Sequence, residues 1–291
     1  NYFMRFSNIL FATGILFGGY FFSLPATADA TKQQFEQGLT AIENGDYQTA
    51  FKLWKPLAED NDMSAQFNLG MMYEKGDGVG QDYFEALKWY KKAAEQGHTT
   101  AQFHLGVMYG SGEGVMQDYF ESVKWYIKAA EKGHAKAQFN LASMYREGLG
   151  VKQDYFEAVK WYRQAAEQGD AKAQLNLGNM YVKGLGVKQD YVEAVKWFRK
   201  AAKQGDAKAQ LNLGNMYAKG RGVKQDYFEA VKWYRKAAEQ GDASAQFNLG
   251  VMYDDGRGVK QDYFEAVKWF RKSAEQGDAD AQSKLGYMYA K

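Results

Sequence analysis

A stretch of 36 residues, Ala209 to Ser244, repeats along this chain and constrains its fold more than any other feature of the sequence. Closely similar copies begin at Ala65, Ala101, Ala137, Ala173 and Ala245. Together the six copies tile residues 65–280 without a gap. A fixed period of this length is typical of supersecondary units that stack in a row, and not of a single globular core.

The first half of the repeat predicts an amphipathic helix. Leu213, Met216 and Tyr217 lie three to four residues apart, which places them on one helical face. Gly214 interrupts this face, and Ala142 is its only replacement among the six copies. Since glycine weakens a helix by about 1 kcal/mol relative to alanine, we expect a neighbouring helix to approach closely at this point.

The second half predicts another helix after a short connector. The connector, residues 220–225, contains two glycines that permit positive φ. Asp226 with Glu229 three residues later is a capping-box pattern, so a helix begins near Tyr227. It ends at Gly241, a typical left-handed position. Each unit is therefore a helical hairpin that cannot cover its own apolar face.

Two motifs within the hairpin resemble those of a known repeat class. Leu213, Gly214 and Tyr217 form L-G-x-x-Y, and Ala230 with Tyr234 forms A-x-x-x-aromatic, as in tetratricopeptide repeats. The 36-residue period, the G-x-G-V insert and the A-A-E-Q-G ending are instead similar to the SEL-one-like repeat family, a close relative. This resemblance implies an all-α protein, a right-handed α/α superhelix (solenoid) of helix-turn-helix repeats.

The segments on either side of the six copies are predicted to cap the solenoid. Residues 31–64 form a shorter hairpin that lacks the six-residue connector, and we interpret it as a tetratricopeptide-like N-terminal cap. Residues 281–291 match the first helix of a seventh unit, in which Ser283 and Lys284 are more polar than their counterparts. We interpret it as a C-terminal capping helix, and a truncated seventh repeat remains the alternative.

Residues 1–30 have the features of a short N-terminal extension and a secretory signal peptide. An apolar run, residues 9–22, follows Arg5 and precedes two small-x-small sites that predict cleavage after Ala28 or Ala30. The run is too short for a stable membrane span, although an uncleaved anchor remains an alternative. We therefore expect an exported protein with no membrane span after cleavage, periplasmic or secreted if the source is bacterial.

The composition narrows the possible chemistry. The chain has no cysteine, which excludes disulfides, thiol catalysis, thiolate metal sites and lipid attachment at a lipobox. Its formal net charge is only +2, which does not favour nucleic acid as a partner. The three histidines lack a partner at ligand spacing, and no hydrolase motif occurs. We therefore predict no enzyme activity, no metal and no cofactor.

Comparison of the copies with one another separates core positions from candidate binding positions. Positions that scarcely change, such as Trp89 and Tyr90, are predicted core. An asparagine recurs at one position of the first helix, and His104 takes its place in the second copy. We interpret it as a structural tether to a neighbouring segment, and a row of side chains that contacts a ligand is the alternative. The asparagines of this column are Asn68, Asn140, Asn176, Asn212 and Asn248.

Variation between copies is concentrated on the first helix of each repeat. In tetratricopeptide-like solenoids the first helices line a concave groove, so the resemblance implies that these variable positions face a partner. Several of them are apolar where we expect solvent, which favours a binding surface over an unconstrained one. The predicted protein-binding residues are Met71, Glu74, Val107, Arg146, Asn179, Asn215, Val251 and Asp254.

These observations predict an exported scaffold or adaptor that binds a protein partner and catalyses nothing. By resemblance to bacterial members of the family, the partner would be an envelope protein or a host protein, in envelope regulation or host contact. A module that binds a glycan or a peptidoglycan fragment is the alternative. A hydrolase is a remote one, because the family members credited with hydrolysis are rich in cysteine.

Overall fold

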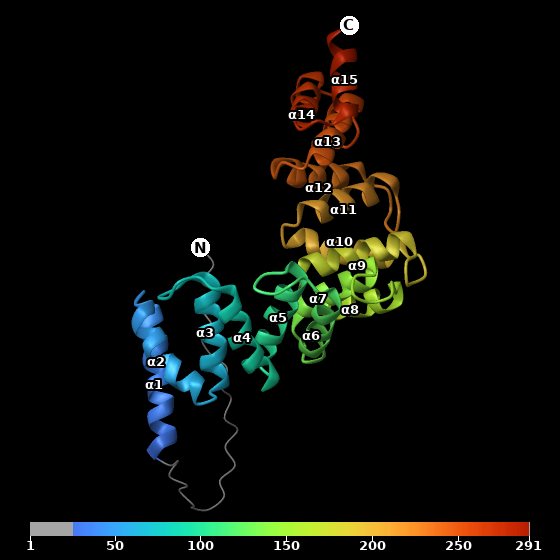
Figure 1. The fold of residues 1–291 in the computed structure, drawn as a ribbon. Helices are drawn as coiled ribbons and strands as arrows, with labels where there is room; N and C mark the ends of the chain where they lie inside the picture. Colours follow the sequence, from blue (N-terminus) through green and yellow to red (C-terminus); the bar gives the residue numbers. More distant parts are fainter. Residues whose placement is uncertain (1–25, 291) are drawn as a thin grey trace, which may run out of the picture.

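The computed structural model describes residues 26–290, which form fifteen α-helices and no strand. Helices of nearly equal length follow one another as hairpins, and the predicted all-α solenoid is confirmed (Figure 1). Their bounds are α1 Ala26–Glu43, α2 Tyr47–Glu59, α3 Met63–Lys75, α4 Tyr83–Glu95, α5 Thr99–Ser111, α6 Tyr119–Glu131, α7 Ala135–Glu147, α8 Tyr155–Glu167, α9 Ala171–Lys183, α10 Tyr191–Lys203, α11 Ala207–Lys219, α12 Tyr227–Glu239, α13 Ala243–Asp255, α14 Tyr263–Glu275 and α15 Ala279–Tyr289.

Local capping explains where these helices begin and end. Asp226 precedes α12, and its carboxylate accepts a hydrogen bond of 3.0 Å from the Glu229 N–H, which satisfies one of the free donors of the first turn. The helix begins at Tyr227, as predicted. Gly241, just beyond its end, has the predicted left-handed conformation with φ +94°.

Glycine in the middle of each first helix makes room for an aromatic ring. A Cβ atom placed on Gly214 would lie 2.6 Å from the ring of Tyr234 in α12, far inside normal contact distance. The predicted close approach of a neighbouring helix is therefore confirmed, and the neighbour is the second helix of the same hairpin. In the third copy, Ala142 in α7 occupies the equivalent position.

Connector glycines join one repeat to the next. Gly222, between α11 and α12, has φ +71°, and a Cβ atom there would lie 2.1 Å from the carbonyl oxygen of Tyr191 at the start of α10. The connector thus rests directly on the backbone of the preceding repeat. Contacts between helices are otherwise made almost only by sequence neighbours, as expected of a linear array.

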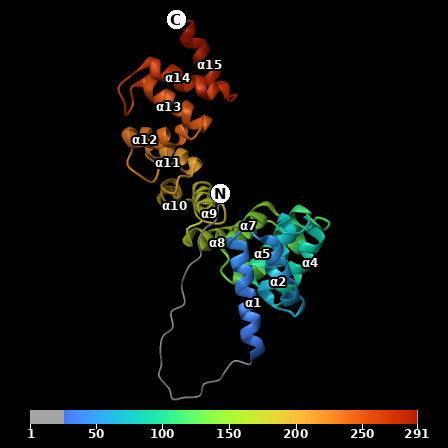
Figure 2. The ribbon, with the colours of Figure 1, turned by 90° about the vertical axis from the view of Figure 1, so that its left-hand side faces the viewer.

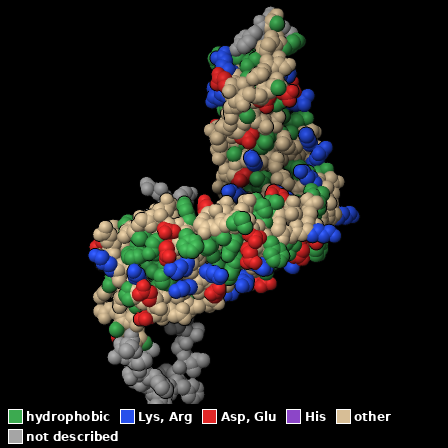
Figure 3. Space-filling view, viewed as in Figure 1, with side chains coloured by type: hydrophobic (Ala, Val, Ile, Leu, Met, Phe, Trp, Pro, Cys, Tyr) green, Lys and Arg blue, Asp and Glu red, His purple; other side chains and the backbone are tan. Residues whose placement is uncertain are grey.

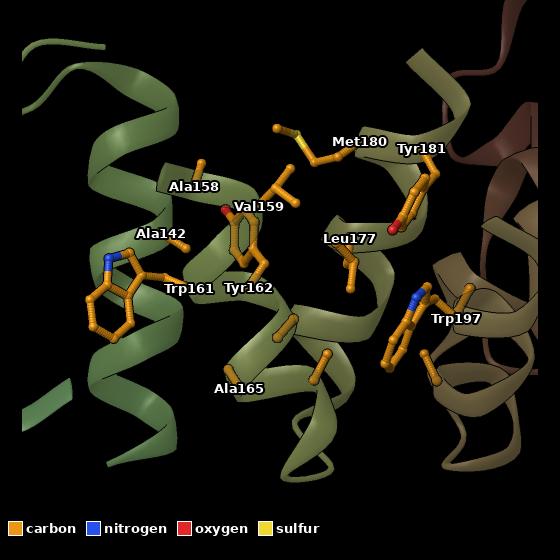
Figure 4. Packing of buried hydrophobic residues seen from close by; sticks show 14 of the residues in the cluster. Ala142, Ala158, Val159, Trp161, Tyr162, Ala165, Leu177, Met180, Tyr181 and Trp197 are labelled. Atoms are coloured by element: carbon orange, nitrogen blue, oxygen red, sulfur yellow. The ribbon is translucent and has the colours of Figure 1, made fainter. Parts of the chain in front are cut away.

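The core runs through these interfaces as four successive clusters of buried side chains. Trp161 and Tyr162 in α8 pack between the helices before and after them, with Leu177 of α9 and Trp197 of α10 further along (Figure 4). A buried glutamine recurs in the first helix of each of the six copies; Gln210, for example, donates 3.1 Å to the Ala202 carbonyl at the end of α10. The sequence comparison did not single out this polar column.

The array is bent and extended in space. Helices α1 to α8 form one arm, and α10 to α15 rise from it as a second arm, in both views (Figures 1 and 2). On the surface of the lower arm, hydrophobic side chains lie among lysines, arginines and acidic residues (Figure 3). The second residue of most second helices is an exposed phenylalanine: Phe84, Phe120, Phe156, Phe228 and Phe264.

Most of the predicted leader, residues 1–25, lies outside the described residues. Residues 26–30, which contain both predicted cleavage sites, fall within the first turns of α1. The boundaries predicted at residues 30, 64 and 280 remain predictions. Among the helices of residues 26–290, none combines the length and apolar character that a membrane crossing requires.

Candidate functional site

The predicted binding residues share one side of the first helices. With about 100° of rotation per residue, positions 2, 5, 6, 9, 12 and 13 of a thirteen-residue first helix point to the same side. All eight predicted residues occupy position 9 or 12. We call this surface the first-helix face. Each of the eight is half-buried, so the face is partly accessible and partly engaged within the solenoid.

Hollows lie along the first-helix face. One, of about 330 Å³, lies between α5, α6 and α7 and is lined by Val107, Asn140 and Ser143 among others. Another, of about 170 Å³, lies between α9, α10 and α11 and is lined by Asn179 and Asn215. Three of the predicted residues therefore line hollows that could receive a side chain.

The charged residues predicted to contact a partner are engaged within the protein. Glu74 accepts hydrogen bonds from Tyr90 Oη in α4 and lies 3.2 Å from His104 Nδ1 in α5. Arg146 donates 2.6 Å to its neighbour Glu147. Asp254 in α13 accepts a hydrogen bond of 3.3 Å from Lys284 in α15. These three charges are thus partly neutralised, which weakens their predicted role as contacts.

The environment of Glu74 shifts its proton affinity. Burial raises the pKa of the Glu74 carboxyl, but hydrogen bonds with His104 and Tyr90 outweigh it and hold the pKa below its ordinary value. Burial, together with the bond to this carboxylate, raises the pKa of the Tyr90 phenol far above its usual range. Glu74 is therefore an ionised acceptor held between two repeats.

From the fourth to the sixth copy, neutral amides on the first-helix face pair across the repeat boundaries. Asn212 donates 3.2 Å to Asn179 Oδ1, and Asn248 donates 3.3 Å to Asn215 Oδ1, each across a repeat boundary. Tyr234 Oη also donates 2.8 Å to Asn215. Asn212 and Asn248 therefore tether adjacent repeats, as predicted, and they do so through side-chain acceptors.

Tyrosine hydroxyls reach the first-helix face, which the sequence analysis missed. Tyr126 accepts a hydrogen bond of 3.0 Å from Asn140, and Tyr162 is 2.9 Å from Ser143. Phe198 and Phe270 occupy this position in the fourth and sixth copies and supply no hydroxyl. The alternation between tyrosine and phenylalanine at this position could have indicated that the hydroxyl makes a hydrogen bond within the fold in only some repeats.

The apolar predicted residues are partly packed. Met71 and Val107 contact hydrophobic clusters from neighbouring helices while remaining half exposed. Phe67, four residues before Met71, stacks on His98 with ring centroids 4.3 Å apart. Phe103 stacks on His134 in the same way at 4.6 Å. These phenylalanines therefore pack within the protein more than they widen an exposed patch.

The repeats of this chain match a known family of repeat proteins. The family model of the Sel1 repeat matches residues 35–62, 64–98, 99–134, 135–170, 171–206, 207–242, 243–278 and 279–291. The chain belongs to the Sel1 repeat family. Members of this family generally mediate protein–protein interaction, and most are scaffolds without enzyme activity.

Two solved Sel1 repeat structures resemble the chain over most of its length. The first is c5321, a protective antigen present in uropathogenic Escherichia coli strains; it is 41% identical with a TM-score of 0.87 over 91% of this chain. A Sel1 repeat protein from Oxalobacter formigenes is 36% identical, with a TM-score of 0.71, and the match covers 82% of this chain and 96% of that protein. This chain spans 58% of the c5321 structure. None of the curated proteins compared with it matches.

Proposed function

We propose that this Sel1 repeat protein is an exported, non-catalytic scaffold that binds a protein partner along its first-helix face. The observation that carries the proposal is the mixed character of that face, where half-buried apolar residues border hollows of about 330 Å³ and 170 Å³. A surface of this kind can receive partner side chains in pockets while neighbouring polar groups fix their orientation.

Two further observations support export and a partner outside the cytoplasm. Residues 1–30 have the composition of a secretory leader. The related c5321 protein is a protective antigen present in uropathogenic Escherichia coli strains, and we propose that this chain likewise acts where it can meet a host. We therefore propose that the partner is an envelope protein or a host protein that meets the chain after export.

Site-specific photocrosslinking tests where the partner binds. Because the chain has no cysteine, a single introduced cysteine can be labelled uniquely with a photoreactive group. Val107→Cys and Val251→Cys place the label on the first-helix face at nearly unchanged volume. Phe120→Cys and Phe264→Cys are matched controls, because each is exposed on the second helix of the same repeat. The four labelled proteins are then exposed to cell envelope, culture medium and host extract.

We expect both first-helix labels to capture the same protein and the second-helix labels to capture far less of it. Equal capture from both faces would show that the partner does not use the first-helix face. If no protein is crosslinked, but muropeptides slow the reaction of the cysteine at position 107 with the label, the glycan-binding alternative is favoured.

A further inference from the structure

Helices α9 and α11 differ in charge from the other first helices. Each contains two lysines and no acidic residue, whereas α13 contains two aspartates and no basic residue. The lysines are Lys172 and Lys183 in α9, and Lys208 and Lys219 in α11. All four are exposed, and within residues 26–290 none of them forms an ion pair.

These lysines form two rows at the borders of the first-helix face. Lys172 and Lys208 occupy position 2 of their helices, and Lys183 and Lys219 occupy position 13. Eleven residues bring an α-helix back to within about 20° of the same side and advance it by about 16 Å. The two rows therefore lie on one side of the solenoid, about 16 Å apart along the helix axes.

The space between the lysine rows is uncharged, with amides at its centre and apolar residues beside each row. It contains the amide pair Asn212 and Asn179, joined by a hydrogen bond of 3.2 Å from Asn212 Nδ2 to Asn179 Oδ1. Asn215 on α11 lies in the same band and accepts from Tyr234. This band contains no carboxylate, so nothing in it neutralises the lysines or repels an anionic partner.

A hollow adjoins each lysine row. The hollow at the first row, about 420 Å³, is lined by Lys172, Lys208 and the half-buried Leu175. Asp206 also lines it, but its carboxylate caps α11 by accepting 2.8 Å from the Ala209 N–H. An apolar side chain could enter this hollow beside two cations.

The hollow at the second lysine row is also bordered by cations. It contains about 170 Å³ and is lined by Asn179, Asn215, Lys219 and Arg221. Arg221 lies in the connector after α11 and is exposed. Two further cations therefore border the amide band on this side.

We propose that this part of the face binds an extended, acidic segment of the partner protein, an inference that rests on the proposed function. A strand that crosses α9 and α11 over the amide band points successive side chains in opposite directions, one set toward each lysine row. Acidic side chains on both edges of the strand then reach both rows. The amides between the rows can hydrogen-bond to the backbone of the strand.

Charge on the neighbouring helix limits the direction of this segment. Asp254 and Asp255 end α13, one repeat further along the face. They would repel acidic residues that continued past α11, although Lys284 partly neutralises Asp254. The acidic stretch of the partner should therefore lie over α9 and α11 and stop before α13.

Fluorescence anisotropy with a labelled ten-residue oligoglutamate tests this proposal on the full chain. One variant replaces Lys172, Lys183, Lys208 and Lys219 by glutamine. The control K188Q/K224Q removes charge from exposed positions in the connectors that follow α9 and α11. Unchanged thermal unfolding of each variant shows that the fold is retained. A ten-residue oligothymidylate tests whether any polyanion is sufficient.

We expect the parent chain to bind oligoglutamate and to lose affinity as salt rises from 50 to 200 mM, because exposed charge pairs are screened. The four-lysine variant should bind about tenfold more weakly or worse, and K188Q/K224Q should bind within about twofold of the parent. Absence of binding, equal losses in both variants, or equally tight binding of the oligothymidylate would each overturn the proposal.

The same variant separates this inference from the proposed function. If labels at Val107 and Val251 capture a protein from the parent chain but capture it equally well when the four lysines are replaced, the acidic segment is wrong and the scaffold stands. If these labels capture no protein from either chain, both proposals fail.

Discussion

At the scale of single residues, one buried acceptor lacks a partner because of a substitution in the second copy. In other copies a glutamine that caps a second helix donates to the buried glutamine column; Gln240, for example, donates 2.8 Å to Gln210 Oε1. Lys132 occupies this position after α6, and its Nζ donates 2.7 Å to the Gly97 carbonyl instead. As a result, the buried Gln102 Oε1 has no hydrogen-bond partner.

Lys132→Gln should therefore stabilise the protein. The new amide can donate to Gln102 Oε1, and satisfying a buried acceptor contributes about 1 kcal/mol. The measurement is the midpoint of thermal unfolding, with Lys152→Gln on an exposed connector as the control for loss of one charge. A gain of the same size in the control would show that charge, not the hydrogen bond, is responsible.

Two histidines make the second and third copies sensitive to pH. His98 and His134 cap α5 and α7 through Nδ1, which accepts the Ala101 N–H at 3.1 Å and the Ala137 N–H at 3.2 Å. Burial lowers the pKa of both imidazoles, and nearby cationic groups, among them His104, lower it further. The folded chain therefore binds protons less readily than the unfolded chain, so acid favours unfolding.

Stability should consequently fall as pH drops below about 6.5, the ordinary histidine value, toward the lower pKa of the folded state. Each lost cap costs about 1 kcal/mol. The double variant H98D/H134D restores the aspartate found before α9 and α11, and it should lose this pH dependence between pH 8 and pH 5. Chemical denaturation at both pH values measures it; an equal fall in the parent and the variant would refute the assignment.

At the scale of helices and connectors, Gly222 and Gly241 show two different reasons why a turn requires glycine. Both have positive φ, +71° and +94°. Only Gly222 approaches other backbone closely, whereas a Cβ atom on Gly241 would meet nothing within 4 Å. Gly241→Ala should therefore cost only the left-handed conformation, about 1 to 2 kcal/mol.

Gly222→Ala should cost considerably more, because the added methyl group also collides with the Tyr191 carbonyl and must push two repeats apart. Overpacking of this kind adds about 1 to 3 kcal/mol. The free energies of unfolding of the two variants give the difference directly. Equal losses would mean that the connector can move away from α10 without penalty.

The same distinction explains what could be predicted from sequence. Asp226 and Gly241 mark the bounds of α12 correctly because capping depends on residues within a few positions of one another. The pairing of Glu74 with His104 joins residues 30 positions apart, so it depends on how adjacent repeats stack. Residue types alone placed Glu74 on the first-helix face but could not show that its charge is already engaged.

Lys172 and Lys183 were not among the predicted binding residues for a related reason. Lysines that recur in adjacent copies do not stand out as variable positions, and over the whole chain acidic residues reduce the net charge to only +2. The local excess becomes visible only when helical geometry places both lysines of α9 on one face beside those of α11. The stacking of α9 beside α11 then brings together two helices without acidic residues, so none of their residues between the rows is acidic.

At the scale of the whole molecule, stability should be local, because each hairpin contacts mainly the hairpins beside it. Trp161 in α8 is 8% exposed and belongs to the central hydrophobic cluster (Figure 4). Trp161→Ala removes a large side chain from that cluster and should weaken local packing by about 3 to 5 kcal/mol. Hydrogen exchange should then speed up in α7 to α9 before it changes in α1 or α14.

Trp89→Ala provides the matched control, because Trp89 is the equivalent residue of α4 and is 5% exposed. Its region of faster exchange should move to α3 to α5, which shows that the loosened segment follows the position of the substitution. If both variants instead accelerate exchange evenly along the chain, the solenoid unfolds as one cooperative unit. In that case no repeat opens independently of the rest. A partner that contacts several repeats could then not stabilise them one at a time.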